Sequence, residues 1–410
     1  MCTTVIAGRQ RSATGRVIVG HNEDLGRNSA HKVSLAAARE PRPGERFELF
    51  SGGSLDQPAR TARFLAAQIY DKRHFPGDYT SGINEHGVAV VNNMATMCGV
   101  AAERQFDVVP GGIIWTEFMQ LVLERATSAR EGVALVGDLC ERFGLSCDSG
   151  TMIAIADSEE AWWVELARGG RWAAERVGDD EVSVRANCYR IPAFAATYGD
   201  QANQADRYNL DRHDVLEARV AAVPALGVPE LMALLRDVFE GTPLHRTRSD
   251  GSPFTTDVRT VAILRTEAAT VLEARPDLPH GLGHRMWCCL STPLTGVFVP
   301  FHTGIQRIEP HYATAGAAYS PDSAYWLFSE LARLVDYRYR ATAELVRAAW
   351  RDVEAAAVRD LAAVEDRCVG LTAPPCSALL SDFDYQRAAE AIRRLEALLP
   401  EVKTRAFHEE

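Results

Sequence analysis

The sequence predicts an α+β protein, with strands and helices mixed over residues 1–315 and a helical extension over residues 316–410. Three observations support this prediction. Residues 3–7 and 17–20 are rich in β-branched side chains, and the polar, glycine-containing stretch between them indicates a hairpin. Residues 151–186 contain short strand-like runs separated by turns, which predicts a β-meander. Toward the C-terminus, Ala, Leu, Arg and Glu recur with helical spacing, which predicts long amphipathic helices that pack on the core or on another subunit.

A buried strand is predicted between the hairpin and the meander. An Asn-Glu-His-Gly turn at residues 84–87 precedes an apolar, β-branched run that ends in Asn92 and Asn93. A run that is apolar on both faces is typical of a strand enclosed between two layers. We therefore expect the two asparagines to lie at the end of an interior strand.

Helices are predicted on either side of the meander. Residues 114–126 and 128–143 have helical apolar spacing. Ser128 followed by Glu131 predicts a capping box at the start of the second helix. Residues 192–255 are polar and partly helical, and they carry no motif that points to chemistry.

The last strands of the mixed region are predicted at residues 255–264, 286–290 and 296–301, all of which are rich in apolar and β-branched residues. In the helical extension, the dipeptide Pro374-Pro375 separates two periodic stretches. Because proline interrupts a helix, the extension is expected to form a hairpin of two long helices.

Composition and charge narrow the class of protein. The chain has 410 residues, of which 47% are hydrophobic and 24% charged, which is ordinary for a globular protein. Its formal net charge of −11 argues against nucleic acid or an anionic membrane as the main partner. The sequence has no apolar run of about eighteen residues and no basic-then-apolar leader at its start. We therefore expect a cytoplasmic protein.

The nine cysteines predict free thiols rather than a cross-linked or metal-bound framework. Their number is odd, their spacing is irregular, and no Cys-x-x-Cys pair occurs. Reduced, mostly buried thiols fit this pattern best. We expect neither a metal ion nor an organic cofactor.

A candidate nucleophile directly follows the initiator methionine. Cys2 has a small side chain, so removal of Met1 is expected, and removal would leave a free α-amine beside the Cys2 thiol. An α-amine has a reference pKa of about 7.7–8.0, so it can be neutral at pH 7 and take the thiol proton. The hairpin would carry the polar run His-Asn-Glu-Asp at residues 21–24 back toward Cys2, where Asp24 would orient the amine or form a hydrogen bond with the backbone of residue 2. A cysteine at position 2 alone more often has no function, and the polar run favours the catalytic interpretation.

Four segments, in this order along the chain, resemble the N-terminal-nucleophile (Ntn) hydrolases, and within them the dipeptidase A family of cysteine peptidases. They are the opening Cys-Thr-Thr with its Asn-x-Asp run, the Gly-Ile-Asn-Glu-x-Gly segment at residues 82–87, the Ala-Asp-x-x-Glu-Ala-Trp and Arg-Ala-Asn segments of the meander, and the strand at 297–301. Secernins, penicillin V acylases and bile salt hydrolases are similar at a greater distance. His21 departs from the pattern, because relatives commonly carry arginine there.

The resemblance implies a four-layer αββα sandwich and a set of site residues. In the wider superfamily, an asparagine like Asn187 donates to the developing oxyanion, and a polar side chain after the strand at 88–91 helps to line the same hole. Either Asn92 or Asn93 matches that side chain, and the sequence leaves the choice open. The catalytic candidates are Cys2, Asp24, Asn187 and Arg259, and the substrate-binding candidates are His21, Asn22, Asn92 and Asn93.

The activity implied by the resemblance is that of a cysteine amidohydrolase, above all a dipeptidase, which acts through a thioester on Cys2. Two alternatives stay open at this point: an N-acyl amide acylase or acyltransferase on the same fold, and a non-catalytic, secernin-like interaction protein. The expected partners are a small peptide or N-acyl amide and further copies of the chain in a homo-oligomer, with neither nucleic acid nor a membrane.

Overall fold

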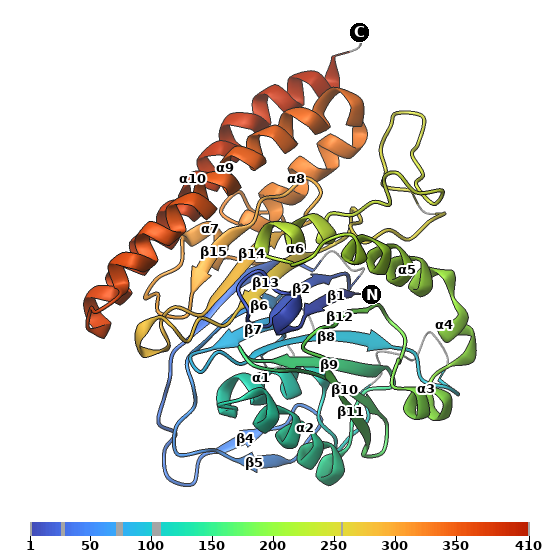
Figure 1. Cartoon of the computed structure of the whole chain (residues 1–410), viewed down its shortest axis with the longest axis vertical. Helices are drawn as coiled ribbons and strands as arrows, with labels where there is room; N and C mark the ends of the chain where they lie inside the picture. Colours follow the sequence, from blue (N-terminus) through green and yellow to red (C-terminus); the bar gives the residue numbers. More distant parts are fainter. Residues whose placement is uncertain (1, 26–28, 71–76, 101–107, 256, 409–410) are drawn as a thin grey trace.

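The computed structural model describes residues 2–25, 29–70, 77–100, 108–255 and 257–408 (Figure 1). One sheet contains β1 (Thr3–Ala7), β2 (Ile18–Glu23), β12 (Val182–Arg185), β13 (Ala268–Glu273), β14 (Arg285–Leu290) and β15 (Val299–His302). The other contains β3 (His31–Ala36), β6 (Phe64–Ile69), β7 (Tyr79–Asn84), β8 (Ala89–Ala95), β9 (Gly150–Ala156), β10 (Ala161–Ala167) and β11 (Arg171–Val177). A separate hairpin is formed by β4 (Arg46–Glu48) and β5 (Ser54–Asp56).

The α-helices are α1 (Trp115–Arg125), α2 (Ala129–Phe143), α3 (Pro192–Tyr198), α4 (Gln201–Ala205), α5 (Arg207–Ala221), α6 (Val228–Leu235), α7 (Pro310–Ala313), α8 (Ala324–Tyr337), α9 (Tyr339–Cys368) and α10 (Ala373–Phe407). The six-stranded sheet has the order β12-β1-β2-β13-β14-β15, and the seven-stranded sheet has the order β11-β10-β9-β8-β7-β6-β3. Within the described part of the chain, no helix has both the length and the apolar character that crossing a membrane would require.

The two sheets pack face to face, with helices on both outer faces (Figure 1). The side chains of β9 show why both faces of this sheet are covered. Met152 and Ala154 belong to the core between the sheets, whereas Ile153 and Ile155 pack with α1 and α2 on the outer face. This alternation is the period of two that a strand imposes. The six-stranded sheet buries its own outer face under α5 and α6. The predicted four-layer α+β sandwich is confirmed.

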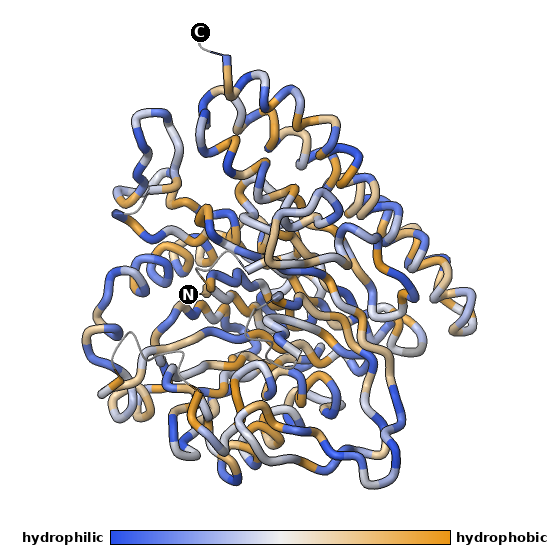
Figure 2. The backbone as a smooth tube through the Cα atoms, turned by 180° about the vertical axis from the view of Figure 1, so that it is seen from behind, coloured by the Kyte–Doolittle hydropathy of each residue, from blue (hydrophilic) through white to orange (hydrophobic). Residues whose placement is uncertain are grey.

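Among the described residues, four α-helices, α7 to α10, follow the last strand, and the long helices α9 and α10 pack together as the predicted hairpin. The periodic stretch that begins at Ser323 is divided between α8 and α9 and is not a single helix. The break between the two helices of the hairpin lies at residues 369–372, and Pro374 and Pro375 follow it in the first turn of α10. Proline is tolerated there because the first helical N–H groups have no partner within the helix. Figure 2 shows hydrophilic and hydrophobic residues alternating along the long C-terminal helices, as expected for helices with one buried face.

Two strand predictions also need correction. Residues 257–264 form bends and turns in the structure, and the strand of this region is β13, a little further along the chain. Apolar, β-branched residues made the segment look like a strand, but the carbonyls of Thr260 and Val261 accept side-chain hydrogen bonds instead of strand partners. In β8, Asn92 and Asn93 lie within the strand and not at its end.

The predicted capping box at α2 is half formed. The Ser128 side chain accepts a hydrogen bond from the Glu131 backbone N–H at 3.2 Å. The Glu131 carboxylate reaches past Ser128 to the Thr127 backbone N–H at 2.9 Å. The helix start at residue 129 is therefore correct, while the reciprocal bond uses the preceding residue.

A buried charged network connects the C-terminal helices to the six-stranded sheet. The Asp384 carboxylate of α10 accepts hydrogen bonds from the His302 backbone N–H at 2.6 Å and from His302 Nδ1 at 2.9 Å. On α9, Glu365 pairs with Arg285 of β14. Burial opposes the charge on His302, but Asp384 and Glu365 outweigh it and raise the pKa of His302 to about 9.

Stability is therefore expected to fall on the alkaline side. A group whose pKa is higher in the folded state stabilises the fold fully below its unfolded pKa, about 6.5 for histidine, and this contribution disappears as the pH rises through about 9. The loss should amount to ~3 kcal/mol between pH 6 and pH 9.5. Urea unfolding at both pH values measures it. In Asp384→Asn the difference should shrink markedly, and an equal difference in both proteins would show that His302 does not carry it.

Candidate active site

The first hairpin places Cys2 against the end of β2. Because Thr3 pairs with Asn22 and Thr4 with His21, alternate residues of the two strands share one face. Cys2 and Thr4 therefore point between the sheets together with His21 and Glu23. Cys2 Sγ lies 3.2 Å from Glu23 Oε1, and Cys2 is fully buried. Glu23 belongs to the polar run at residues 21–24, and no role was predicted for it.

The surroundings of the Cys2 thiol favour its protonated form. Burial, followed by the negative charge of Glu23, raises the pKa of the Cys2 thiol well above its usual value. The N-terminal positive charge acts in the opposite direction, as does the Asp24 backbone N–H that bonds the sulfur. Attack by Cys2 thus requires a base that takes the thiol proton at the moment of reaction.

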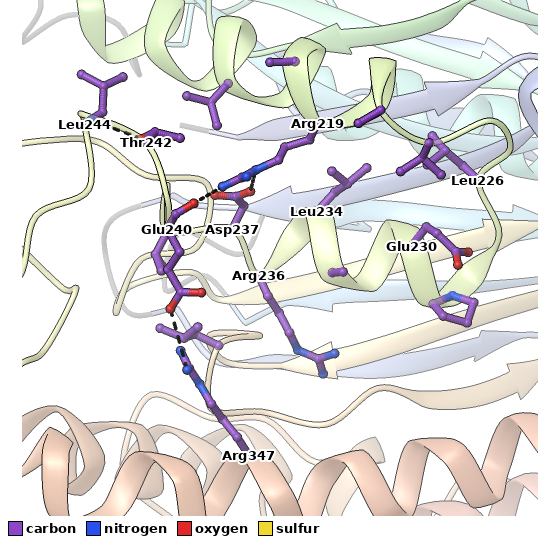
Figure 3. A pocket seen from close by; sticks show the side chains of 18 of the residues that line it. Arg219, Leu226, Glu230, Leu234, Arg236, Asp237, Glu240, Thr242, Leu244 and Arg347 are labelled. Atoms are coloured by element: carbon purple, nitrogen blue, oxygen red, sulfur yellow. Dashed lines mark hydrogen bonds and ion pairs between the residues drawn. The ribbon is translucent and has the colours of Figure 1, made fainter.

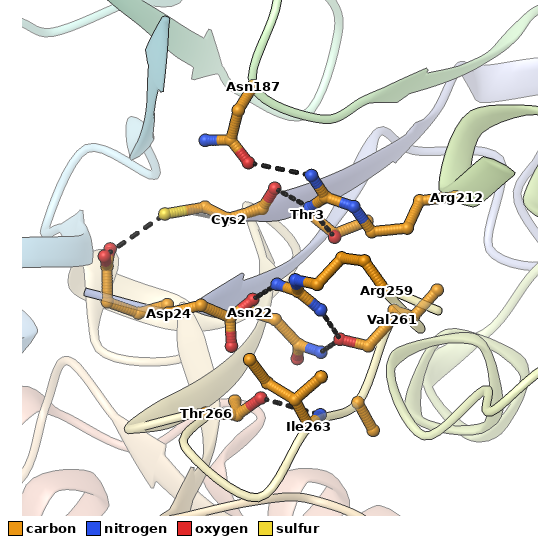
Figure 4. Close-up of polar contacts among 12 residues, drawn as sticks. Cys2, Thr3, Asn22, Asp24, Asn187, Arg212, Arg259, Val261, Ile263 and Thr266 are labelled. Carbon is orange, nitrogen blue, oxygen red and sulfur yellow. Dashed lines mark hydrogen bonds and ion pairs between the residues drawn. The ribbon is translucent and has the colours of Figure 1, made fainter. Parts of the chain in front are cut away.

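Asp24 and Arg259 form a buried ion pair beside the hairpin (Figure 4). Asp24 follows β2 directly, and its carboxylate Oδ2 accepts from the Arg259 guanidinium. Arg259 also donates to the Thr260 carbonyl, and this bond holds its guanidinium against the bends and turns of residues 257–264. Both catalytic candidates are therefore brought to the Cys2 neighbourhood, although the predicted strand around Arg259 does not form.

Arg212 is a site residue that no sequence pattern predicted. It lies on α5, is fully buried, and extends between the Cys2 backbone and Asn187 (Figure 4). Burial, and next the positive charge of Arg259, lower the pKa of Arg212 to about 9. Its N–H groups donate to the Cys2 carbonyl at 2.7 Å, Thr3 Oγ1 at 2.9 Å, Asn187 Oδ1 at 3.0 Å, Asn209 Oδ1 at 3.0 Å and the Tyr208 carbonyl at 2.9 Å.

Asn187 is held in one orientation by these contacts. Arg212 binds its Oδ1, and its Nδ2 donates to the Met94 carbonyl at 2.8 Å. An amide nitrogen carries two N–H groups, so a second donor remains on Nδ2 beyond the Met94 contact. The predicted oxyanion donor is thus near Cys2 with its amide direction fixed.

Strand alternation places Asn92 and Asn93 on opposite faces of β8. Val91 belongs to the core between the sheets, so Asn93 shares its face, whereas Asn92 points to the outer side and donates to Thr151 Oγ1 at 2.7 Å. Asn93 donates to the carbonyls of residues 185 and 186 at 3.1 and 2.8 Å, and its Oδ1 accepts from Thr4. Asn93 therefore supports the site through Thr4, and Asn92 is misplaced for the substrate contact that we expected.

Asn22 also lies on the wrong face for substrate. It alternates with His21 along β2, and its Nδ2 donates to the Leu235 carbonyl at 2.9 Å and the Val261 carbonyl at 3.2 Å. These contacts tie β2 to the end of α6 and to the turn that follows Arg259. The expectation that Asn22 contacts substrate is corrected to a structural role.

His21 faces the thiol side of the hairpin, as a substrate-binding candidate should. Its Nε2 lies 3.3 Å from Glu23 Oε2, and its Nδ1 lies 2.8 Å from Thr4 Oγ1. The strand period of two, applied to residues 21–24, would have paired His21 with Glu23 and separated both from Asn22.

A cavity of about 1120 Å³ lies elsewhere, between α5, α6 and α9 on the outer side of the six-stranded sheet (Figure 3). Arg219 crosses it to Asp237 and the Glu240 carbonyl. Cys2 is not among the described residues that line this cavity, so it is separate from the cluster around the thiol.

Comparison with known proteins identifies the family. The family model of peptidase family C69 matches residues 1–207 and 214–352. A probable dipeptidase B from Lactococcus lactis is 24% identical over 97% of this chain and 95% of its own length. A probable dipeptidase A from Streptococcus pyogenes is 23% identical over 82% of this chain and 83% of its own. A solved structure of a mutant conjugated bile acid hydrolase from Clostridium perfringens aligns with a TM-score of 0.44 and 13% identity, over 74% of this chain and 92% of that one. The resemblance seen in the sequence is confirmed, and the chain belongs to peptidase family C69.

Proposed function

We propose that this protein is a cysteine dipeptidase of the Ntn type, which hydrolyses small peptides with a free α-amine through a thioester on Cys2. The observation that carries the proposal is the carboxylate of Glu23 at 3.2 Å from the Cys2 sulfur. Membership of a peptidase family and relatives described as dipeptidases support the same reaction class.

The reaction begins on a chain from which Met1 has been removed. The Cys2 α-amine takes the thiol proton, and Sγ attacks the carbonyl carbon of the peptide bond. The resulting ammonium gives its proton to the leaving nitrogen as the C–N bond breaks, which leaves a thioester. A water molecule, deprotonated by the same amine, then attacks the thioester carbon, and Sγ leaves with the proton restored.

The residues around Cys2 stabilise the tetrahedral intermediate and hold the nucleophile in position. Asn187 donates its second N–H to the oxygen that becomes negative in the tetrahedral intermediate. Arg212 positions both the Cys2 carbonyl and the Asn187 amide. The Asp24–Arg259 pair holds the first turn after β2, whose backbone N–H bonds the Cys2 sulfur.

Glu23 favours a dipeptidase over an acylase for N-acyl amides. In an aminoacyl group the α-nitrogen lies only ~2.5 Å from the carbonyl carbon, and the attacking sulfur approaches that carbon to ~3–3.5 Å. The α-ammonium is therefore within reach of a carboxylate that touches Sγ, and a charge-assisted hydrogen bond would hold it. In an N-acyl amide the attacked carbonyl belongs to the acyl group, whose α-carbon carries no ammonium, so no cationic group would meet the carboxylate.

Substitution of Glu23 by glutamine is expected to lower kcat/KM for unblocked dipeptides by about 10²-fold, because the α-ammonium loses its charged partner. Parallel assays with an unblocked dipeptide and its N-acetyl derivative measure the effect. The ratio of the two kcat/KM values should fall in Glu23→Gln. An unchanged ratio would mean that Glu23 does not recognise the amine.

The activity itself is tested by intact mass and product analysis on the same preparation. We expect a mass lower than that of the full sequence by one methionine, and release of both amino acids from an unblocked dipeptide. Cleavage of N-acyl substrates alone would identify an acylase, and transfer to an added amine would identify an acyltransferase. A processed chain with no turnover on any of these substrates would contradict an enzymatic role.

A further inference from the structure

We propose that Cys2, His21 and Glu23 form a binding site for Zn²⁺, and that the bound ion reversibly blocks the nucleophile. The effect on turnover rests on the proposed function, whereas the site itself rests on geometry. One ligand atom from each residue lies within 4.8 Å of the other two. Each of the three side chains is at most 1% exposed.

The face that carries the ligands is set by the hairpin. Cys2 opens β1, and His21 and Glu23 alternate on β2, so all three point between the sheets. The Glu23 carboxylate lies between the other two groups, with Oε1 at 3.2 Å from Cys2 Sγ and Oε2 at 3.3 Å from His21 Nε2. A search for Cys-x-x-Cys spacing cannot find such a site, because its ligands are neighbours across a hairpin and not along the chain.

A chain of hydrogen bonds fixes which nitrogen of His21 carries the proton. Asn93 gives its N–H groups to two backbone carbonyls, so its Oδ1 accepts the hydroxyl proton of Thr4 at 2.6 Å. Thr4 has only one proton to donate. The 2.8 Å contact between Thr4 Oγ1 and His21 Nδ1 therefore requires the imidazole to be the donor.

Because Nδ1 carries the proton directed at Thr4, Nε2 is the ring nitrogen that faces Glu23. Two lone pairs that face each other at 3.3 Å repel unless a proton or a cation lies between them. A metal-binding histidine in proteins normally donates its second ring N–H to a polar neighbour, and Thr4 fills that place here. The arrangement prepares Nε2 as a ligand before any metal arrives.

The donor set selects zinc among the common divalent ions. One thiolate, one imidazole and one carboxylate suit Zn²⁺, with ligand distances of about 2.0–2.3 Å and a tetrahedral geometry. The thiolate and carboxylate charges cancel those of the ion, so the complex is neutral, as a buried site requires. On binding, the Zn–S bond forms, the S–H bond breaks, and its proton leaves to solvent. The sulfur lone pair that attacks substrate is then occupied, and the carboxylate proposed for the α-ammonium is occupied too.

A second imidazole stands close to this cluster. His31 is buried, its Nδ1 bonds the Ser29 carbonyl at 2.9 Å, and its Nε2 has no hydrogen-bond partner among the described residues. Burial lowers the pKa of His31, and the charges of Glu23 and His21 also act on it. His31 is therefore the alternative nitrogen ligand that an experiment has to separate from His21.

Co²⁺ titration of the chelator-treated, processed protein under reducing, oxygen-free conditions tests the site without any need for turnover. We expect a thiolate-to-cobalt charge-transfer band that saturates at one equivalent and is bleached by added Zn²⁺. The band should disappear in Cys2→Ala, and His21→Arg should remove it because a guanidinium offers no lone pair. All proteins carry Cys98→Ser, since Cys98 is exposed and could bind cobalt by itself. Absence of the band, or its persistence in His21→Arg, would overturn the proposal, and loss of the band only in His31→Gln would overturn the assignment of His21 as ligand.

Thr4→Val tests the hydrogen bond that orients His21. Valine keeps the shape of the side chain but lacks the oxygen that accepts the His21 N–H. Affinity for Co²⁺ should fall by about 10–100-fold, as for other partners of metal-bound histidines. Dipeptide hydrolysis should stop on addition of Zn²⁺ and recover with a chelator. A cobalt band without dipeptide turnover would leave the metal site standing and reject the proposed function. Turnover that depends on Cys2, with no cobalt band and no inhibition by zinc, would support the proposed function and reject the metal site.

Discussion

Replacing Cys2 with alanine is expected to abolish dipeptide hydrolysis, with kcat reduced by roughly 10⁴–10⁶-fold. No other group in the proposed mechanism can form the thioester, and what remains is binding and oxyanion stabilisation. Alanine, like cysteine, is small enough to permit removal of Met1, so both proteins should carry a free α-amine. The comparison therefore isolates the thiol. Steady-state kinetics, with intact mass to verify processing, provide the measurement.

Two further variants serve as controls for Cys2→Ala. Cys98→Ala removes an exposed thiol far along the chain and should leave kcat unchanged. Cys2→Ser keeps a hydroxyl beside the amine and should retain a small residual rate, because a serine oxygen can be activated by the same base. Full turnover in Cys2→Ala would reject Cys2 as nucleophile and, with it, the mechanism.

The four-layer sandwich was predicted from the resemblance to the Ntn hydrolases, and strands such as β9 give its physical basis, because their side chains alternate with a period of two between two cores. The same period predicts that Cys2 shares a face with Glu23, once the hairpin register is known. A strand was wrongly predicted at residues 257–264, because an apolar run does not show which groups its carbonyls bond to. There, buried side chains from Arg259 and Asn22 compete with a strand partner.

Arg212 shows what sequence patterns cannot reveal. It lies on a helix rich in charged residues, where an arginine is expected to be exposed to solvent. Its burial arises from a contact with the Cys2 carbonyl, 210 positions earlier in the chain. A single sequence has no signal for such a pairing. Glu23, by contrast, could have been recognised from strand alternation together with the hairpin register.

Arg212→Lys is expected to lower kcat by about 10²–10³-fold while KM changes much less. Lysine keeps the positive charge but cannot bind the Cys2 carbonyl and the Asn187 amide together, because its ammonium is a single point and not a planar fork. Asn187 then loses its fixed orientation, and an oxyanion donor is effective only when it is preorganised. Separate determination of kcat and KM distinguishes this positioning role from substrate binding.

Loss of stability alone could also reduce activity, so a buried arginine away from the thiol supplies the control. Arg285 is buried and donates to Glu273 at 2.6 Å, and it also pairs with Glu365. Arg285→Lys should destabilise the fold, since each buried acceptor left without a donor costs ~1–3 kcal/mol, yet its kcat should match the wild type in the folded fraction. Equal losses of kcat in the two variants at equal unfolding midpoints would show that Arg212 only supports the fold. A loss confined to Arg212→Lys would place the guanidinium in the catalytic geometry, as the structure predicts.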